Sequence, residues 1–429
     1  MKDRPLLRRL TWDIFVLGFL PVFILAAILP GKRRSIGIFG SFPVINFKYW
    51  SAALNQVGIH SMTIVDGVFS INSSNDFDRM FSDFVSPVVP LPIRRRLGGC
   101  IALLFVLRRA SVLHTCWAGF AFPDSSFWRL ESWLLRRAKI PAVILPIGGD
   151  IYMYSKVLDP GIRYGLLAHY PNAGRQEARI SRKVQHWIKH GDVVLAGLML
   201  DGIGRWDVTT PQPIVINTDA WTCPNSRSGQ DGINGSVTIV HAPNHRDLKG
   251  TEFILDAVST LREEGLDVEL VLLEGVPNEQ VRKTLQSADI LVDQLVLFAY
   301  ALSALEGMAS GMPVLANLDN DLYASVYRRY SFLDECPILS TTPETVTDHL
   351  RALVTNPKLR HQLGTAGRQY AEKYHSYSAA QYLFTEIYKS FANPGSIDLL
   401  KLYHPLANGS PTGHDRVIHP LHANRLIGE

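Results

Sequence analysis

Residues 236–317 read SVTIVHAPNHRDLKGTEFILDAVSTLREEGLDVELVLLEGVPNEQVRKTLQSADILVDQLVLFAYALSALEGMASGMPVLAN. In this stretch short β-branched runs alternate with amphipathic helical patterns, which predicts a parallel sheet covered by helices on both faces. The ligand of such a sheet binds beyond the carboxyl ends of its strands. The residues that directly follow each strand are therefore the first candidates for function. The expected strands are 237–240, 268–273, 290–292 and 313–316.

Polar or small residues follow three of these strands. The turn at 244–250 comes after the first strand and carries His245, Arg246 and Lys249 just before a helix expected to begin near Thr251. Cations beside the free N–H groups of a helix N-terminus are suited to phosphate. This edge of the sheet is therefore predicted to bind a phosphorylated ligand. The predicted binding residues here are Asn244, His245, Arg246, Lys249, Glu274, Gly275, Asp293 and Gln294.

The segment FAYALSALEGMASGMPV, residues 298–314, adds a carboxylate to the same edge. Its pattern predicts a helix with Glu306 on the second turn. A carboxylate in that place can accept both hydroxyls of a ribose, as acidic residues do in dinucleotide sites. Phosphate and ribose ligands together predict a nucleotide site. The residues at the start of the helix belong to the predicted site as well: Tyr300, Ala301, Leu302 and Ser303.

These residues resemble the C-terminal domain of GT-B glycosyltransferases of the retaining family 4 type, and the resemblance extends over roughly residues 35–390. It implies an α/β chain with two Rossmann-like, doubly wound domains facing a cleft. It also implies that Lys249 and Arg246 hold the diphosphate of a nucleoside-diphosphate sugar and that Glu306 binds its ribose. Such sites work without a divalent metal, so neither a metal nor another cofactor is expected.

The chain departs from the family pattern at two positions in this domain. The family carries a first Glu eight residues before the second, and Phe298 stands in that place. Asp293 and Gln294, just upstream, could supply the missing polar contact. The usual diphosphate Arg falls near Asn244, so Arg246 is a stand-in for it.

Residues 35–215 are predicted to form the acceptor-side domain. Gly40 ends its first strand, at 35–40, and Ser41 follows it; both are expected at the cleft. His114 and Cys116 end a later strand that faces the cleft in the family pattern, although a core histidine is the alternative for His114. Many family members have His at the position of Cys116. A Gly-Gly-Asp turn at 148–150 adds Asp150, and the predicted catalytic set is Lys249, Arg246, Glu306, His114 and Asp150.

The amino terminus combines a hydrophobic segment with basic flanks. Residues 14–30 are apolar, with lysines and arginines on both sides, and Pro21 would kink a helix there. Three interpretations stay open for residues 1–34: a single membrane span, an interfacial or re-entrant segment, and a buried extension of the domain. Residues 91–113 join basic ends to an apolar core, which fits either docking on an anionic bilayer or an ordinary buried helix.

Length and composition bound the remaining possibilities. A chain of 429 residues has room for two ordinary domains, and its net charge of +4 suits anionic lipid or phosphate better than a nucleic-acid groove. Nucleic acid is therefore not an expected partner. The expected organisation is a membrane segment (1–34), an acceptor domain (35–215), a linker (216–235), a donor domain (236–370), a crossover helix (371–392) and a loosely ordered tail (393–429).

The resemblance implies a retaining glycosyltransferase that moves a sugar to a lipid-linked or polysaccharide acceptor in cell-surface glycan biosynthesis. It would be membrane-associated, with its catalytic domains in the cytoplasm. Because Phe298 and Cys116 replace polar residues of the family, a weak or inactive GT-B protein that binds nucleotide or glycan as a partner subunit is the alternative. A different GT-B enzyme, such as a nucleotide-sugar epimerase or a phosphorylase, is a third hypothesis.

Overall fold

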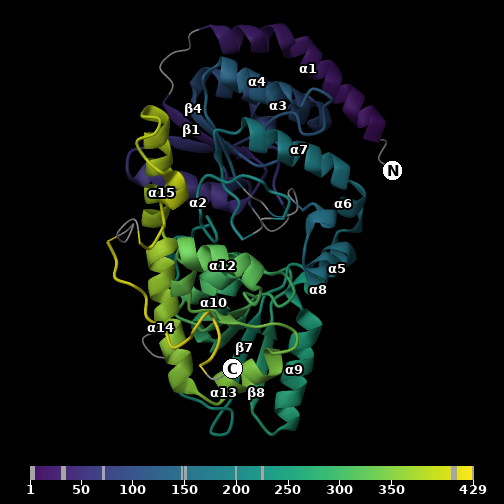
Figure 1. The fold of residues 1–429 in the computed structure, drawn as a ribbon. Helices are drawn as coiled ribbons and strands as arrows, with labels where there is room; N and C mark the ends of the chain where they lie inside the picture. The colour runs from purple at the N-terminus through teal and green to yellow at the C-terminus, as the bar shows by residue number, and fades with distance from the viewer. Residues whose placement is uncertain are drawn as a thin grey trace.

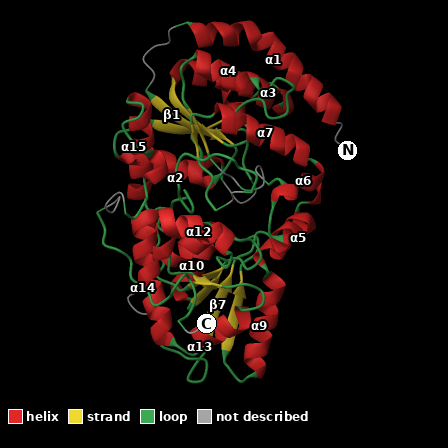
Figure 2. Ribbon diagram, in the orientation of Figure 1, coloured by secondary structure: helices red, strands yellow, loops and turns green. Residues whose placement is uncertain are grey.

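The chain folds into two α/β halves stacked into an elongated molecule, with the N-terminal half above the C-terminal half in Figure 1. Each half contains one parallel sheet with helices on both faces, as Figure 2 shows. The structure is a computed structural model, and the residues it describes are 5–29, 35–69, 73–145, 148, 152–198, 201–223, 227–406 and 413–427.

The N-terminal sheet has six strands in the order β3-β2-β1-β4-β5-β6, and all neighbours in it are parallel. The strand order reverses between β1 and β4, so these two central strands flank the switch point of this sheet. The strands are β1 (Ile36–Ser41), β2 (Ser61–Val65), β3 (Arg79–Met80), β4 (Ala110–Thr115), β5 (Ala142–Ile144) and β6 (Val193–Val194).

Helices bury apolar residues on both faces of this sheet. On one face, Phe39 of β1 packs with Phe47 of α2 and Phe384 of α15. On the other face, Ile38 shares a core with Leu103 of α3, Leu134 of α4 and Trp187 of α7. The helices are α2 (Ile45–Gln56), α3 (Leu91–Arg109), α4 (Leu130–Arg137), α7 (Glu177–His190) and α15 (Tyr377–Ala392).

The C-terminal sheet has five parallel strands in the order β11-β10-β9-β7-β8. Its strand order reverses at the β7–β9 pair, which makes the carboxyl ends of these strands the expected binding edge. All four strands expected from residues 237–316 are present, to within a residue or two at their ends. The strands are β7 (Val237–His241), β8 (Val268–Leu272), β9 (Ile290–Val292), β10 (Val314–Ala316) and β11 (Leu339–Ser340).

Two layers of helices cover this second sheet as well. Ile254 of α9 and Leu350 of α13 pack on one face, and Leu305 of α11 and Tyr370 of α14 pack on the other. The doubly wound arrangement expected for this half is therefore present. Its helices are α8 (Arg246–Lys249), α9 (Thr251–Glu263), α10 (Asn278–Ser287), α11 (Leu302–Ala309), α12 (Asp321–Tyr330), α13 (Val346–Val354) and α14 (Pro357–Tyr374).

The chain returns to the N-terminal half through α14 and α15, which run along one side of the molecule in Figure 1. Residues 371–392 were expected as one helix, but they form the end of α14 and all of α15. The break lies at His375, whose Nδ1 is 2.8 Å from the Ile214 carbonyl oxygen and whose Nε2 is 3.1 Å from the Tyr300 hydroxyl. Ser376 then caps α15 by accepting a hydrogen bond from the Ala379 N–H.

A segment of the N-terminal half completes the core of the C-terminal half. Residues 152–170 include α5 (Pro160–His169), and they are followed by the short α6 (Pro171–Arg175). Leu166 of α5 is fully buried in the same cluster as Leu248 and Phe298. The two halves are therefore joined by apolar packing, in addition to the α14–α15 crossover.

The described part of the tail is more ordered than the sequence suggested. Val417 is buried in the core of the C-terminal half, and Asn424 donates hydrogen bonds to the carbonyl oxygens of Cys336 (2.8 Å) and Ile338 (3.1 Å). Arg416 pairs with Asp334 at 2.5 Å. Residues 413–427 therefore pack on this half despite their weak periodicity, because a few apolar and amide side chains anchor them.

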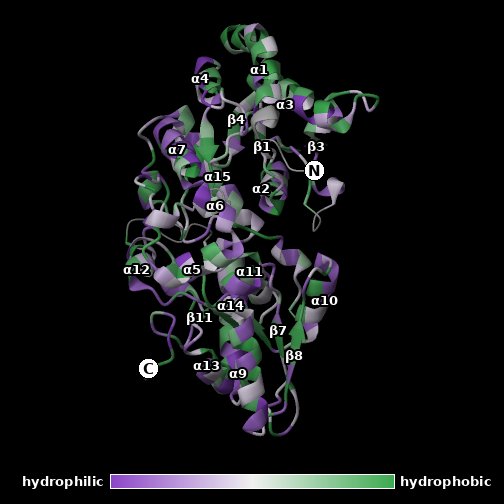
Figure 3. Ribbon diagram, turned by 90° about the vertical axis from the view of Figure 1, so that its right-hand side faces the viewer, coloured by the Kyte–Doolittle hydropathy of each residue, from purple (hydrophilic) through white to green (hydrophobic). Residues whose placement is uncertain are grey.

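The N-terminal hydrophobic segment forms α1 (Pro5–Ile28), a helix that lies across the outer end of the N-terminal half (Figure 1). Residues Arg9–Ile28 are long and apolar enough to cross a membrane, by length and composition. In Figure 3 most of this helix is coloured as hydrophobic. One of its faces packs on α3 and α4, where Phe23 is fully buried and its ring lies 5.5 Å from that of Phe122.

Candidate functional site

The switch point of the C-terminal sheet gathers the predicted nucleotide-binding residues. The chain leaves β7, turns through 242–245 and forms the single turn of α8, which ends with Lys249. Gly250 follows in the left-handed region, at φ 72°, and is the N-cap residue of α9. A Cβ at Gly250 would lie 2.9 Å from the Leu295 Cβ, so glycine also allows this turn to pack against the loop after β9.

Lys249 is buried in a hydrogen-bonded cluster with Asp293 and Ser303. Its Nζ forms an ion pair with Asp293 and donates to the Ser303 Oγ at 3.1 Å. Ser303 donates to Asp293 Oδ1 at 2.5 Å, and the Ala301 N–H donates to Oδ2 at 3.1 Å. Burial acts to raise the pKa of Asp293, but Lys249 and these donors outweigh it and lower that pKa. The cluster therefore holds a charged ammonium–carboxylate pair.

Glu306 lies one helical turn beyond Ser303 on α11, so the ammonium and the second carboxylate share one edge of the sheet. Its Oε1 accepts a hydrogen bond of 3.0 Å from the Asn278 side chain, at the start of α10. Burial, and next the charge of Asp293, raise the pKa of Glu306 to about 7. This carboxyl group is therefore poised to change its charge near neutral pH.

The N-terminal half approaches Glu306 through Tyr49 of α2. Burial, and next the nearby Glu306 carboxylate, raise the pKa of the Tyr49 phenol above its ordinary value. A second contact between the halves joins Tyr170 to His245, whose ring lies 4.1 Å from that of His169. Burial, then His169 and Lys249, lower the pKa of His245 to about 4, so this imidazole is neutral at pH 7.

Arg246 lies at the surface beside the buried cluster. Its guanidinium pairs with Glu252 at 2.8 Å and with Glu274 at 2.9 Å. Glu274 follows β8, as expected, and Gly275 comes next at φ 65° with open space around it. In this conformation Arg246 is directed to carboxylates, and to reach a diphosphate it must release them. Asn244 is exposed in the turn before α8.

The loop after β9 is braced by the other predicted residues. Gln294 donates to the carbonyl oxygens of Leu297 (3.2 Å) and Ala299 (2.8 Å). The Tyr300 hydroxyl lies 2.9 Å from that of Tyr370, in a fully buried pair. Leu302 is the first residue of α11. These side chains hold the loop that presents Ala301, Ser303 and Glu306.

Phe298 is buried and packs on Tyr323 of α12, with ring centroids 5.2 Å apart. Its neighbours include Ile162 and Leu198 from the N-terminal half. Phe298 thus contributes to apolar packing between the halves, in the place where the resembling family has a polar residue.

The structure places His114 in the core of the N-terminal half. It is fully buried, stacks on Phe39 at 4.0 Å, and its Nε2 is 2.6 Å from the Tyr388 hydroxyl of α15. Burial lowers its pKa to about 3, so it stays neutral. This environment matches the core alternative for His114. Cys116 is also buried.

Gly40 and Ser41 end β1 in a tightly packed region. A Cβ at Gly40 would lie 2.1 Å from the Ile64 carbonyl oxygen, and the buried Ser41 hydroxyl donates to the Phe120 carbonyl. The close packing of Gly40 and the hydrogen bond of Ser41 therefore indicate that both residues have a structural role at the end of β1. Asp150, the remaining predicted catalytic residue, lies outside the described residues.

Three residues near the site were missed by the sequence analysis: Asn278, Tyr49 and Tyr170. Asn278 could have been found, because it begins the helix that follows β8 and so belongs to the same sheet edge. Tyr49 and Tyr170 come from the other half of the chain, and only the packing of the two halves brings them to the site.

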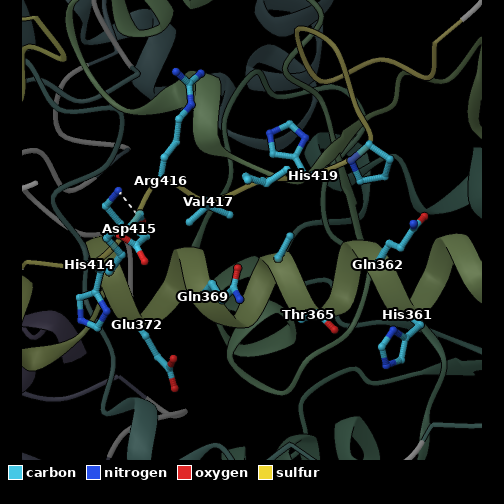
Figure 4. Close-up of a pocket in the computed structure, with 14 residues that line it drawn as sticks. His361, Gln362, Thr365, Gln369, Glu372, His414, Asp415, Arg416, Val417 and His419 are labelled. Carbon is cyan, nitrogen blue, oxygen red and sulfur yellow. Dashed lines mark hydrogen bonds between the residues drawn. The ribbon is translucent and has the colours of Figure 1, made fainter.

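A separate pocket of about 740 Å³ lies between α14 and the tail, as Figure 4 shows. His361, Gln369 and Glu372 line it from the helix, and His414, Asp415 and Arg416 line it from the tail. The described lining residues include none of those predicted from the sequence. In the described part of the chain, no group of three or more His, Cys, Asp or Glu side chains is arranged to hold a metal ion.

No protein-family model matches this sequence, and no curated protein sequence matches it. The fold, in contrast, is similar to sucrose-phosphate synthase from Thermosynechococcus elongatus, with a TM-score of 0.54 and 12% identity over 84% of this chain and 99% of that one. This similarity supports the expected GT-B arrangement of two parallel-sheet α/β domains, and identity this low establishes the fold alone.

Two further solved structures have TM-scores below 0.5, so their similarity to this chain supports no conclusion by itself. A glycosyltransferase from Rickettsia africae has a TM-score of 0.48 and 10% identity, over 85% of this chain and 100% of that one. WaaG, a glycosyltransferase involved in lipopolysaccharide biosynthesis, has a TM-score of 0.43 and 14% identity, over 84% of this chain and 100% of that one.

Proposed function

We propose that this protein is a glycosyltransferase that takes its sugar from a nucleoside-diphosphate sugar. The observation that carries the proposal is the cluster at the β7–β9 switch point, where Lys249 contacts Ser303 and Glu306 lies one helical turn further on. A cation and a carboxylate at the binding edge of a parallel sheet match the two polar ends of a nucleotide, its phosphates and its ribose.

In the proposed complex, Lys249 donates to the diphosphate and Glu306 accepts hydrogen bonds from the ribose hydroxyls. Lys249 would then share its charge between Asp293 and the phosphate, and the ribose would replace the Asn278 hydrogen bond at Glu306. Charge builds up on the diphosphate as the glycosidic bond breaks, so a preorganised ammonium beside it stabilises the transition state more than the ground state.

The finer parts of the proposal rest on the resemblance to retaining GT-B enzymes. Transfer would occur with retention of configuration, by a front-face displacement in which the leaving diphosphate helps to deprotonate the acceptor, without a divalent metal. The acceptor would be a lipid-linked glycan or a polysaccharide, bound by the N-terminal half at a membrane surface. Both halves would then lie in the cytoplasm.

The direct test is to incubate the full chain with a panel of UDP-, GDP-, ADP- and dTDP-sugars and to measure release of the nucleoside diphosphate. We expect one donor to be turned over, with release that increases when a lipid-linked acceptor is added. Failure of every nucleotide sugar to bind would overturn the proposal.

The buried position of Phe298 supports a second candidate, a GT-B protein that binds a nucleotide sugar without transferring it. Phe298 packs on Tyr323 and offers no polar group to a donor sugar. Tight binding of one nucleotide sugar without nucleoside diphosphate release, with every acceptor tried, would favour this candidate over the enzyme.

Nucleotide-sugar affinity is expected to increase between pH 6 and pH 8. The pKa of Glu306 is raised to about 7, so most of it is protonated at pH 6 and ionised at pH 8. Only the ionised form accepts both ribose hydroxyls, and the ionised fraction rises about tenfold over this range. Calorimetric titration with a nucleotide sugar measures the change in affinity. The diphosphate diester of this ligand has no group that titrates between pH 6 and pH 8, so the pH dependence reports on the protein.

Glu306→Gln is the control for this pH dependence. It keeps the shape of the side chain and removes its titration, so its binding should be weaker and independent of pH. A wild-type affinity that stays constant or falls from pH 6 to pH 8 would contradict the assigned role of Glu306.

A further inference from the structure

The outer face of α1 is an apolar surface without a partner in the described chain. Seven aliphatic side chains of this segment are between 47% and 69% exposed. Most of them recur every three or four residues, so they form one stripe along the helix. Apolar stripes of this length on a protein surface mark a binding site for another protein or a membrane. We define the outer stripe as Leu10, Ile14, Leu17, Val22, Leu25, Ile28 and Leu29.

The opposite face of α1 holds the helix flat on the N-terminal half. Trp12, Val16 and Phe23 are buried there. Trp12 fits because α3 has a glycine opposite it: a Cβ at Gly99 would lie 3.2 Å from the indole ring. The helix is therefore built into the core of this half along much of its length.

Polar contacts fix both ends of α1 in this position. Near its start, Asp13 accepts hydrogen bonds from the Ser125 hydroxyl (2.6 Å) and the Ser126 N–H (2.7 Å), and Arg9 donates to the Ser126 hydroxyl (2.8 Å). Near its end, Arg108 of α3 donates to the Leu29 carbonyl at 3.3 Å. A helix that crossed a bilayer would have to break these contacts and carry Asp13 into hydrocarbon.

The segment on which α1 packs is rich in basic residues. Residues 90–140, which supply α3 and α4, contain nine lysines and arginines and two acidic residues. The two acids are engaged: Asp124 pairs with Arg179 at 2.8 Å, and the buried Glu131 accepts backbone hydrogen bonds from residues 120–122. The sequence before and after the helix is basic as well, with Lys2 and Arg4 on one side and residues 32–34 on the other.

Aromatic side chains lie among the arginines in α4 and just before it, and α4 is one of the helices that pack on α1. Phe127 is partly exposed, Arg129 lies over the Trp128 ring at 4.3 Å, and Arg137 lies over the Trp133 ring at 5.5 Å. Tryptophan and arginine side chains are characteristic of the headgroup region of a bilayer, where one end is apolar and the other is wet.

We propose that α1 lies in the plane of an anionic membrane leaflet, with its outer stripe inserted among the acyl chains and its flanking arginines on lipid phosphates. The occupant of the stripe is then a lipid surface, since the basic rim complements anionic headgroups and an apolar face flanked by cations is the pattern of interfacial helices. This specifies how the proposed membrane association occurs, and it places both halves of the protein on one side of the bilayer.

The inference rests on the membrane association in the proposed function but not on the nucleotide site, so the two can fail separately. The test measures co-sedimentation of the full chain with vesicles of phosphatidylcholine alone or with one-third phosphatidylglycerol. We expect binding to the anionic vesicles, and Ile14→Glu should weaken it about tenfold or more. Nucleotide-sugar binding in detergent should stay unchanged in the variant.

Ile233→Glu is the matched control, because Ile233 is 75% exposed, against 69% for Ile14, and lies in a turn of the C-terminal half. It should leave vesicle binding unchanged. Equal loss in both variants, or wild-type protein that ignores anionic vesicles while still binding a nucleotide sugar, would overturn the docking surface. So would a wild-type dimer that Ile14→Glu converts to a monomer without changing vesicle binding, since the stripe would then face a second copy.

The depth of α1 in the bilayer distinguishes a helix that lies in the membrane plane from one that spans the membrane. Fluorescent labels on Leu17→Cys and Ile28→Cys, each in a Cys223→Ser background, are quenched by lipids that carry nitroxides at known depths. These positions are about 16 Å apart along the helix. An in-plane helix gives the same shallow depth for both labels, whereas a label at position 17 near the bilayer centre would show a spanning helix and overturn the proposal.

Discussion

Replacing Lys249 with methionine is expected to lower the free energy of unfolding by about 3–5 kcal/mol. The reason is that Asp293 is fully buried and its pKa is held low by Lys249, so the variant leaves a carboxylate without its counter-charge. Urea titrations of wild type and variant, followed by intrinsic fluorescence, measure the difference.

A double variant distinguishes the effect of leaving Asp293 without its counter-charge from the effect of losing the Lys249 side chain itself. Lys249→Met with Asp293→Asn removes both charges, and the amide keeps the shape that Ser303 and Ala301 contact. This double variant should regain most of the lost stability. Lys283→Met is the control, because Lys283 forms an exposed pair with Glu279 on α10, and it should unfold like wild type. A single variant as stable as wild type would contradict the buried ion pair.

The same double variant should bind the preferred nucleotide sugar roughly 100-fold more weakly, a loss of about 3 kcal/mol for a charge-assisted hydrogen bond to phosphate in a buried site. Because its fold is retained, the loss reports on binding and not on unfolding. Calorimetric titration measures it, with Lys283→Met again as the control. If the double variant bound the nucleotide sugar with wild-type affinity, this result would show that Lys249 is not part of the nucleotide site.

Arg246→Met gives an informative comparison with this result. Arg246 pairs with Glu252 and Glu274 in the free protein, so its contribution to phosphate binding is reduced by the cost of leaving them. We expect a smaller loss of affinity than at Lys249. A loss of equal size would mean that Arg246 changes partner when the nucleotide binds.

The C-terminal half could be predicted well because its pattern is local. Each strand there is a short β-branched run bounded by a turn, and parallel strands bring their carboxyl ends to one edge. Lys249 and Glu306 are therefore close in space although 57 residues separate them in the sequence. What this pattern does not contain is the partner of each side chain, so the pairing of Asp293 with Lys249 came only from the structure.

The N-terminal half was harder because its functional positions depend on distant packing. His114 ends a strand, as an active-site histidine can, but Phe384 and Tyr388 of α15 enclose it from some 270 residues further along the chain. The orientation of α1 could not be predicted from the sequence either, because hydropathy alone does not distinguish a helix that spans a membrane from one that lies on a domain. The structure adds that Trp12 and Phe23 on one face of α1 are buried against the N-terminal half.

The most direct test of the account is a structure of the protein with its nucleotide sugar bound. We predict the diphosphate within hydrogen-bond distance of Lys249 Nζ and the ribose hydroxyls at the Glu306 carboxylate, both at the β7–β9 edge. A nucleotide found elsewhere, for example in the pocket between α14 and the tail, with Lys249 still held only by Asp293 and Ser303, would contradict it.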